Sequence, residues 1–239
     1  MIHKKFIIIE GIDGCGKGTV INAIIDFLKK NKIKFIDLRE NNSELKDCKA
    51  ILTCEPTHHG TGKELRDKIL KNLKEYTARQ VAEKFTEDRN LLYENVIIPS
   101  LKNGLVVFQD RSLISTFVYQ VNEAIKNNEK FSTTDIANMN KVAMENLPGL
   151  VIVQNVNPEV AHSRLTGRTD KQDDTEFEKM EFLKKNSEGY REGEWRHLFE
   201  DKGTDIEDLD CNAQIDIVKQ NAVKIIIYYL KRNNLDLLN

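Results

Sequence analysis

The stretch KFIIIEGIDGCGKGT, residues 5–19, decides the fold. Its first part, Lys5–Ile9, is a short apolar run rich in β-branched residues, which is typical of a parallel strand buried on both faces. A glycine-rich loop follows, and then a helical pattern at about Lys17–Lys30 with apolar residues on one face. This order predicts a phosphate cradle, in which loop N–H groups and the positive end of the helix dipole bind phosphate oxygens.

The glycine loop fits the nucleotide-binding pattern G-x-x-x-x-G-K-[ST] at every position except the last, where Gly18 replaces Ser or Thr. Lys17 is expected to reach the transferring phosphates. The missing hydroxyl normally binds Mg²⁺, and Thr19 cannot replace it because one helical residue is a rotation of about 100°. The predicted ATP-binding residues are Gly11, Ile12, Asp13, Gly14, Cys15, Gly16, Lys17, Gly18 and Thr19.

Any Mg²⁺ bound with ATP is therefore expected to be held largely through water and the nucleotide phosphates, with help from a carboxylate elsewhere in the chain. Asp110 is the candidate, because it ends an apolar run of strand character, and the carboxyl ends of strands are where such folds bind ligands. The alternative is that Asp110 only caps a helix.

Further runs of strand character lie at 34–38, 51–54, 105–109 and 150–153, with a weaker one at 206–209. Helical patterns alternate with them, including a long one at 78–101 with Pro99 kinking its end and one that ends at Pro148-Gly149. A polar stretch at about 39–50 has the composition of a surface insertion. We find no repeat and no linker, so residues 1–239 are predicted to form one α/β domain with a parallel sheet covered on both faces.

Composition narrows the class of protein. The chain has 239 residues and a net charge of −2, which provides no basic field for nucleic acid or an anionic membrane. Apolar runs are far shorter than the roughly 20 residues needed to cross a bilayer, and no targeting segment is visible. Four cysteines without a C-x-x-C pair favour a reducing compartment. We expect a cytoplasmic protein with neither nucleic acid nor membrane as a partner.

A second phosphate site is predicted where the strand at 105–109 ends. Arg111 could clamp a phosphate in a bidentate manner, and Ser115, Tyr119 and Gln120 share one face of the helix that follows. Phe85 and Arg89 lie four residues apart on the long helix, as a stacking ring and its hydrogen-bonding partner would. Taken alone, Phe85 fits a core residue and Arg89 a surface ion pair with Glu83 or Asp88.

These segments together resemble the thymidylate kinase family from end to end. The resemblance rests on EGIDGCGKGT, TCEPTHHGTGKELR, FTEDRNLLYENVIIPSLKNG, DRSLISTFVYQ and LDCNAQID, in that order. It implies a P-loop NTPase-type, three-layer α/β/α fold with a central parallel five-stranded sheet and a mobile lid. It also implies transfer of the ATP γ-phosphate to dTMP with Mg²⁺, by a homodimer.

The resemblance assigns roles to individual residues. Catalysis is implied for Lys17, Arg111 and Asp13, together with an arginine of the lid at about 163–177, either Arg164 or Arg168. The implied substrate-binding residues are Glu55, Arg66, Phe85, Arg89, Asp110, Arg111, Ser115, Tyr119 and Gln120. The chain departs from the family at Cys54, where an arginine usually precedes Glu-Pro, and Arg66 is the candidate to compensate.

Two other functions remain open from the sequence. A deoxynucleoside kinase would use a 5′-hydroxyl acceptor and would need Glu55 as general base. A nucleotide-binding regulator or pseudoenzyme is suggested by Gly18 and Cys54. Supplying thymidine and dTMP separately with ATP distinguishes all three.

Overall fold

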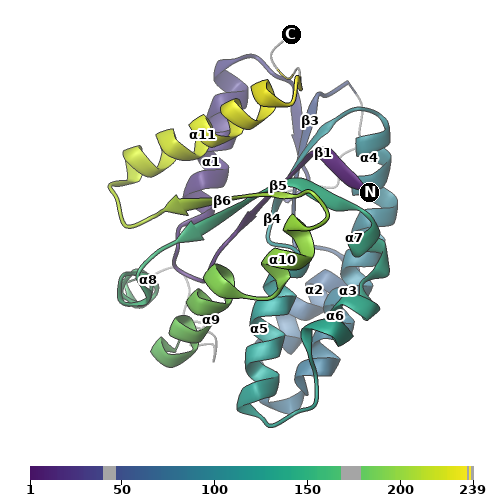
Figure 1. Cartoon of the computed structure of the whole chain (residues 1–239), viewed down its shortest axis with the longest axis vertical. Coiled ribbons are helices and arrows are strands. Elements are labelled where there is room, and N and C mark those ends of the chain that lie inside the picture. The colour runs from purple at the N-terminus through teal and green to yellow at the C-terminus, as the bar shows by residue number, and fades with distance from the viewer. Residues whose placement is uncertain (40–46, 168–178, 236, 238–239) are drawn as a thin grey trace.

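The chain forms one six-stranded parallel sheet with helices on both faces (Figure 1). The structure is a computed structural model that describes residues 1–39, 47–167, 179–235 and 237. The strands lie in the order β2-β3-β4-β1-β5-β6 and every neighbouring pair is parallel. The α/β prediction is therefore confirmed, but the sheet has six strands rather than five, because the weak candidate near residue 206 pairs fully with β5.

The strand burial follows from position in the sheet. Central strands are buried on both faces, as in β3, where all five residues are buried. The edge strand β6 has mostly acidic residues facing solvent, which discourages pairing with another chain. The strands are β1 (Ile2–Glu10), β2 (Phe35–Asp37), β3 (Ala50–Cys54), β4 (Val106–Asp110), β5 (Leu147–Asn155) and β6 (Asp205–Asp210).

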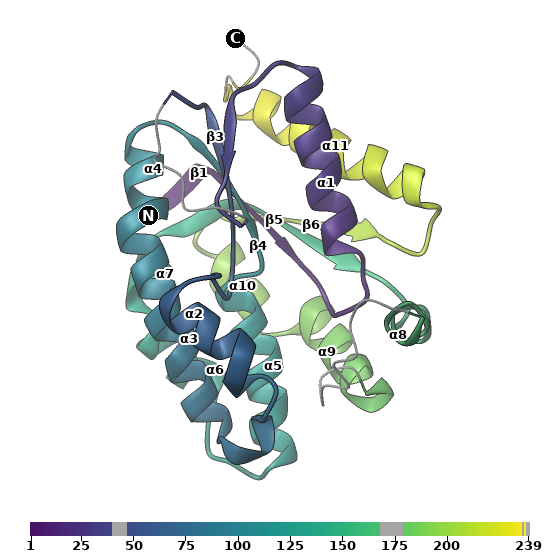
Figure 2. The ribbon, with the colours of Figure 1, turned by 180° about the vertical axis from the view of Figure 1, so that it is seen from behind.

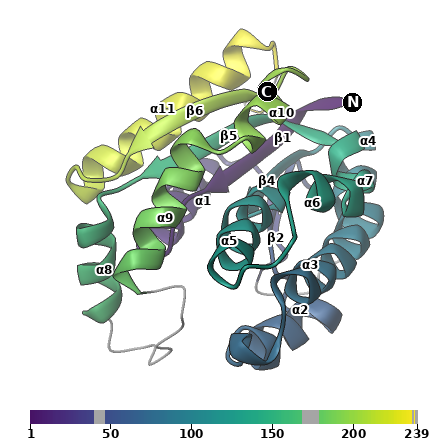
Figure 3. The ribbon, with the colours of Figure 1, turned by 60° about the horizontal axis from the view of Figure 1, so that its bottom comes forward.

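Helices α1 (Lys17–Lys30) and α11 (Ile215–Arg232) pack together on one face of the sheet, as Figures 1 and 2 show from opposite sides. The other face carries α3 (Ala78–Leu92), α4 (Ile98–Lys102) and α5 (Leu113–Lys126). Helix α9 (Met180–Glu192) packs between α5 and α8 (Pro158–Thr166) (Figure 3). The shorter helices on this side are α2 (Gly60–Glu64), α6 (Thr133–Met139), α7 (Lys141–Glu145) and α10 (Trp195–Glu200). None of the helices described is long and apolar enough to cross a membrane.

The sequence pattern predicts that Pro148 and Gly149 end a helix. This prediction is wrong, because both residues lie inside β5. Pro148 pairs in register with His3, next to an irregularity in the β1–β5 ladder between His3 and Ile7. A Cβ on Gly149 would come within 2.6 Å of the Lys4 Cα, so only glycine lets the two strands approach here. The breakers therefore mark a bulge in a ladder, where proline and glycine are tolerated.

The predicted helix at 78–101 is three pieces. Thr77 caps α3 through a capping box with Gln80, and a π-helical turn at Tyr93–Ile97 leads into α4. Pro99 lies in the first turn of α4, where its missing N–H is least costly. Two smaller boundaries also differ from prediction. The sequence pattern predicts that a helix begins near Ser115, whereas α5 begins at Leu113, and Ala50 of the predicted insertion belongs to β3. Residues 40–46 of that insertion lie outside the described residues.

Candidate functional site

The glycine loop between β1 and α1 has the backbone that a phosphate cradle requires. Gly11, Gly14 and Gly16 have φ values of 146°, 78° and 101°, which side chains rarely adopt. A Cβ at Gly14 would lie 2.4 Å from the carbonyl oxygen of Ala161. Gly18 differs, since it is exposed in α1 and a Cβ there would meet nothing within 4 Å. The loop thus needs three of its glycines for its shape, and Gly18 is not one of them.

The cationic side chains at the loop bind its own carbonyl groups. Lys17 Nζ donates to the carbonyl oxygens of Gly11 and Ile12, each at 2.9 Å. Arg164 Nη1 lies 3.4 Å from the carbonyl oxygens of Gly14 and Cys15. Both cations therefore lie at the loop. Arg168 and most of the predicted lid at 163–177 fall outside the described residues.

The thiol of Cys15 is packed beneath the loop and is only 1% exposed. Burial raises its pKa, against the opposing charges of Lys17 and Arg111. A buried neutral thiol is a poor nucleophile and a poor target for oxidation.

Asp13 joins the glycine loop to the predicted second site. Its carboxylate pairs with Arg111 and accepts a hydrogen bond of 3.0 Å from the Tyr119 hydroxyl. The Arg111 guanidinium lies over the Tyr119 ring, 5.5 Å from its centre, and donates to Ser115 Oγ at 3.3 Å. Arg111 itself has a φ of 63°, a strained conformation for a residue other than glycine, directly after β4. Three of the four residues that the sequence placed in the second phosphate site, Arg111, Ser115 and Tyr119, are thus in contact, and Asp13 of the glycine loop joins them. Gln120, the fourth, is buried at 2% exposure.

Glu10 is a member of this cluster that the sequence analysis did not single out. It ends β1, is fully buried, and accepts hydrogen bonds from the hydroxyls of Ser112, Ser115 and Tyr190 at 2.8–2.9 Å. Burial raises the pKa of Glu10, while Arg111 and the three hydroxyl donors oppose that rise. Tyr190 belongs to α9, so this carboxylate ties α9 to the base of the glycine loop. Only the fold reveals this, because 180 residues separate the two.

Arg89 does not form the surface ion pair that its sequence neighbours suggested. It exposes no surface and pairs with Glu55, with Nε at 2.9 Å and Nη2 at 2.7 Å from the same carboxylate oxygen. Its Nη1 donates to Asn140 at 2.6 Å and its Nη2 donates to Thr116 at 2.9 Å. Gln109 Nε2 donates to the other oxygen of Glu55. Burial raises the pKa of Glu55 to about 7, although Arg89 lowers it.

Phe85 lies one turn before Arg89, partly exposed and packed against a small apolar cluster of Leu65, Ile69 and Val81. Phe85 therefore packs on the protein and still exposes part of its surface, where a ligand could contact it.

Cys54 and Arg66 are in contact. Arg66 Nη2 lies 3.6 Å from Cys54 Sγ, and Nε lies 3.0 Å from the Pro56 carbonyl oxygen. The arginine that the sequence proposed as a substitute is thus beside the position that lacks one.

Asp110 offers one unsatisfied atom at the sheet edge. Its Oδ1 is buried without a hydrogen-bond partner, as are Thr53 Oγ1 and Gln109 Oε1 nearby in the sheet. A carboxylate oxygen left unpaired beside the phosphate loop fits a role in holding Mg²⁺ through water. Among the residues described, no group of three or more His, Cys, Asp or Glu side chains could hold a metal ion directly.

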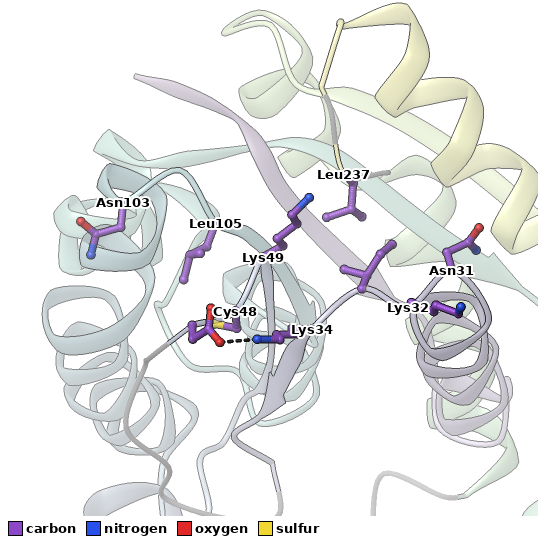
Figure 4. A pocket seen from close by; sticks show the side chains of 10 residues that line it. Asn31, Lys32, Lys34, Cys48, Lys49, Asn103, Leu105 and Leu237 are labelled. Atoms are coloured by element: carbon purple, nitrogen blue, oxygen red, sulfur yellow. Dashed lines mark hydrogen bonds and ion pairs between the residues drawn. The ribbon is translucent and has the colours of Figure 1, made fainter. Parts of the chain in front are cut away.

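A separate cavity of about 540 Å³ lies at the amino ends of β2, β3 and β4, away from the carboxyl ends where the glycine loop lies (Figure 4). Lys34, Lys49 and Leu105, which precede β2, β3 and β4, line it together with Leu237. Lys34 pairs there with Asp47. In parallel sheets ligands bind at the carboxyl ends of strands, so the glycine loop and not this cavity marks the candidate active site.

Comparison with known proteins identifies relatives of the chain. The family model described as thymidylate kinase matches residues 9–221. The thymidylate kinase of Caldicellulosiruptor saccharolyticus is 31% identical over 192 residues, which cover 79% of this chain and 82% of that protein. The thymidylate kinase of Prochlorococcus marinus is 33% identical over 204 residues, covering 80% and 86% respectively.

Proposed function

Because the chain belongs to the thymidylate kinase family, we propose that it transfers the γ-phosphate of ATP to dTMP, giving dTDP and ADP. The observation that carries this proposal is the contact of Asp13 with both Arg111 and Tyr119. It places the end of β4, where an acceptor phosphate would bind Arg111, directly beside the loop that would hold ATP. Two phosphate sites that adjoin each other are what phosphoryl transfer between nucleotides requires.

The chemistry needs little proton transfer, because a monophosphate oxygen is already anionic at neutral pH. Catalysis then rests on positioning and on charge stabilisation. Lys17 would exchange its two carbonyl contacts for donor phosphate oxygens, and Arg111 would hold the acceptor phosphate. Arg164, already at the loop, is the described candidate for neutralising the transferring group, with Arg168 as the other. Mg²⁺, held through water near Asp110, would neutralise charge on the phosphates of ATP.

Recognition of thymine is proposed for Phe85, Arg89, Tyr119 and Gln120. Phe85 is partly exposed, as a stacking ring must be. Arg89 Nη1 carries two N–H groups, and one of them donates to Asn140. Arg89 exposes no surface in this structure, so donation of the other N–H to thymine would require a local rearrangement that opens the guanidinium to the site.

The test is a coupled ADP-release assay with each common nucleoside monophosphate and, separately, thymidine. We expect turnover with dTMP above all others. Lys17→Ala and Arg111→Ala should each lose about 10³-fold or more in kcat while remaining folded. Lys84→Ala and Arg79→Ala, on the exposed side of α3, are the matched controls and should keep normal activity. Near-normal dTMP turnover by either site variant would overturn the assignment.

The deoxynucleoside kinase alternative needs Glu55 free to accept a proton from a hydroxyl acceptor. Here Glu55 is 3% exposed, and both its oxygens accept hydrogen bonds from Arg89 and Gln109. This arrangement favours the monophosphate acceptor. Turnover of thymidine rather than dTMP would support the alternative, and nucleotide binding without any transfer would support a regulator.

We further propose that the protein acts in the cytoplasm as a homodimer, as the family resemblance implies. Leu91 on α3 and Ile125 on α5 are 53% and 64% exposed, so these two helices offer apolar side chains for contact with a second copy of the chain. Light scattering at micromolar concentration should give twice the chain mass of 27.5 kDa, and a monomer would refute this part.

A further inference from the structure

A second group of cations lies at the carboxyl ends of β2 and β3, around the uncharged side chain of Cys54. It consists of Arg39 and Arg66, of which only Arg66 was predicted from the sequence to bind substrate. The two arginines come from different segments, one after β2 and one from the π-helical turn Leu65–Ile69. Both act electrostatically on the Cys54 thiol, as does Asp110.

Arg39 is brought to this edge by strand register. Asp37 pairs with Leu52, and the N–H of Leu38 donates to the Leu52 carbonyl at 2.9 Å, so Arg39 follows close to the level of Cys54. Asp37 orients the arginine by accepting from its Nε at 2.9 Å and its Nη2 at 2.6 Å. Nη1 has no partner among the described residues. Burial lowers the pKa of Arg39, but the Asp37 bonds more than offset this, so the side chain stays charged.

Arg66 is partly buried and has no carboxylate partner in the described part of the chain. Its guanidinium contacts only the carbonyl oxygens of Pro56 and Thr57 and the thiol of Cys54. Burial raises the pKa of that thiol to about 11, although Arg66 lowers it, so the thiol is neutral at physiological pH. A partly desolvated cation without a counter-charge is unfavourable unless an anion binds beside it.

The order of strands places this pair next to the acceptor site. Cys54 ends β3 in register with Asp110, which ends β4 and is followed by Arg111. The P-loop follows β1, on the far side of β4 from β3. An anion at Arg39 and Arg66 would therefore lie beyond Arg111 as seen from the ATP phosphates, on the side of the acceptor.

We propose that Arg39, together with Arg66, binds the phosphate of the acceptor nucleotide in this chain. The proposal rests on the proposed function for the identity of that acceptor. Residue 54, at the end of β3, is a cysteine where the family usually has an arginine. Arg39, which follows the neighbouring strand β2, would supply the positive charge instead. Asp37 acts as a positioning residue, because it holds Arg39 through two nitrogens and leaves the third for the ligand.

The test compares two ligands that differ only in the phosphate. Calorimetry measures the Kd of dTMP and of thymidine for the wild type, Arg39→Gln and Arg66→Gln, with Arg79→Gln as a matched control on exposed α3. Loss of one charge-assisted contact should weaken dTMP binding about 10- to 100-fold and leave thymidine binding within about twofold. The KM for ATP should stay unchanged, and Asp37→Asn should show a smaller loss of dTMP affinity.

Equal weakening of dTMP and thymidine by Arg39→Gln would mean a structural role and overturn the proposal, as would no weakening at all. Thermal unfolding of each variant checks that it is folded. Because Arg66 also hydrogen-bonds loop carbonyls, its replacement could alter the loop, so the result for Arg39→Gln decides the test. The binding assay needs no turnover. A wild type that fails to phosphorylate dTMP refutes the proposed function, whereas an active wild type with an unaffected Arg39→Gln refutes this inference alone.

Discussion

Replacement of Arg89 by glutamine should destabilise the protein strongly and in a way that depends on pH. Arg89 exposes no surface, and its Nε and Nη2 pair with one oxygen of Glu55, which is itself 3% exposed. Removing one partner of a buried ion pair typically costs about 3–5 kcal/mol, because the other charge stays buried without compensation. Asn140 and Thr116 lose a donor as well. We expect a loss in this range at pH 8.

The pH dependence follows from the pKa of Glu55. In the folded wild type it is raised to about 7 by burial, against about 4.5 in the unfolded chain. A raised folded pKa contributes stability that is complete below the unfolded pKa and is lost as pH rises through the folded pKa. Without Arg89, the main group that lowers it, the pKa rises further, so the variant continues to lose stability above pH 7. The difference between variant and wild type should widen above pH 7 by up to about 1.4 kcal/mol per pH unit.

Urea unfolding followed by tryptophan fluorescence measures this directly. Trp195 is the only tryptophan, is 1% exposed, and packs edge-on against Phe199. Arg79→Gln is the control, since its pair with Asp135 is long and about 40% exposed on both sides and should contribute less than about 1 kcal/mol. The double variant Arg89→Gln/Glu55→Gln should recover part of the stability and lose the widening above pH 7. A single-variant loss below about 1 kcal/mol at pH 8, unchanged at pH 5, would refute the reasoning.

Three further predictions concern the scaffold of the site. Gly14→Ala should be destabilised by more than about 2 kcal/mol and lose ATP affinity, because its Cβ would lie 2.4 Å from a carbonyl oxygen at a φ of 78°. Gly18→Ala, at an open helical position, should instead be stabilised by about 0.4–1 kcal/mol. Calorimetric unfolding measures the stability change of each variant, and changes of the same sign would contradict the loop geometry. Tyr190→Phe should cost about 1–2 kcal/mol by removing a donor from buried Glu10, measured in urea, and a neutral result would show that Ser112 and Ser115 suffice. Thr77→Ala should cost about 1 kcal/mol by removing the α3 capping box, while Thr77→Ser should restore most of it.

What could be predicted from the sequence was mostly local. The glycine loop, its flanking strand and helix, and the position of Asp110-Arg111 after β4 all follow from patterns within about twenty residues, and the structure has them as expected. The clustering of Arg111, Ser115 and Tyr119 followed from helical spacing together with parallel strand ends.

The parts that were missed depend on contacts distant in sequence. The partner of Arg89 is Glu55, 34 residues away, and no periodicity indicates it. The position of Arg39 near Cys54 follows from the register of β2 with β3, and the contact of Tyr190 with Glu10 follows from the packing of α9 on α5. Pro148-Gly149 misled because a bulged strand and a helix end use the same residues.

The order of strands has a consequence for synthesis of the chain. Strand β1 is made before both strands with which it pairs, β4 and β5, whose last residues are Asp110 and Asn155. At roughly 5–20 residues per second, the ribosome needs on the order of ten seconds or more to supply both neighbours. During that interval the apolar run Phe6–Ile9 emerges with a free backbone edge on each side, the kind of segment that aggregates or engages chaperones. The nucleotide loop that follows β1 therefore has both flanking strands of its sheet only once β5 has been made.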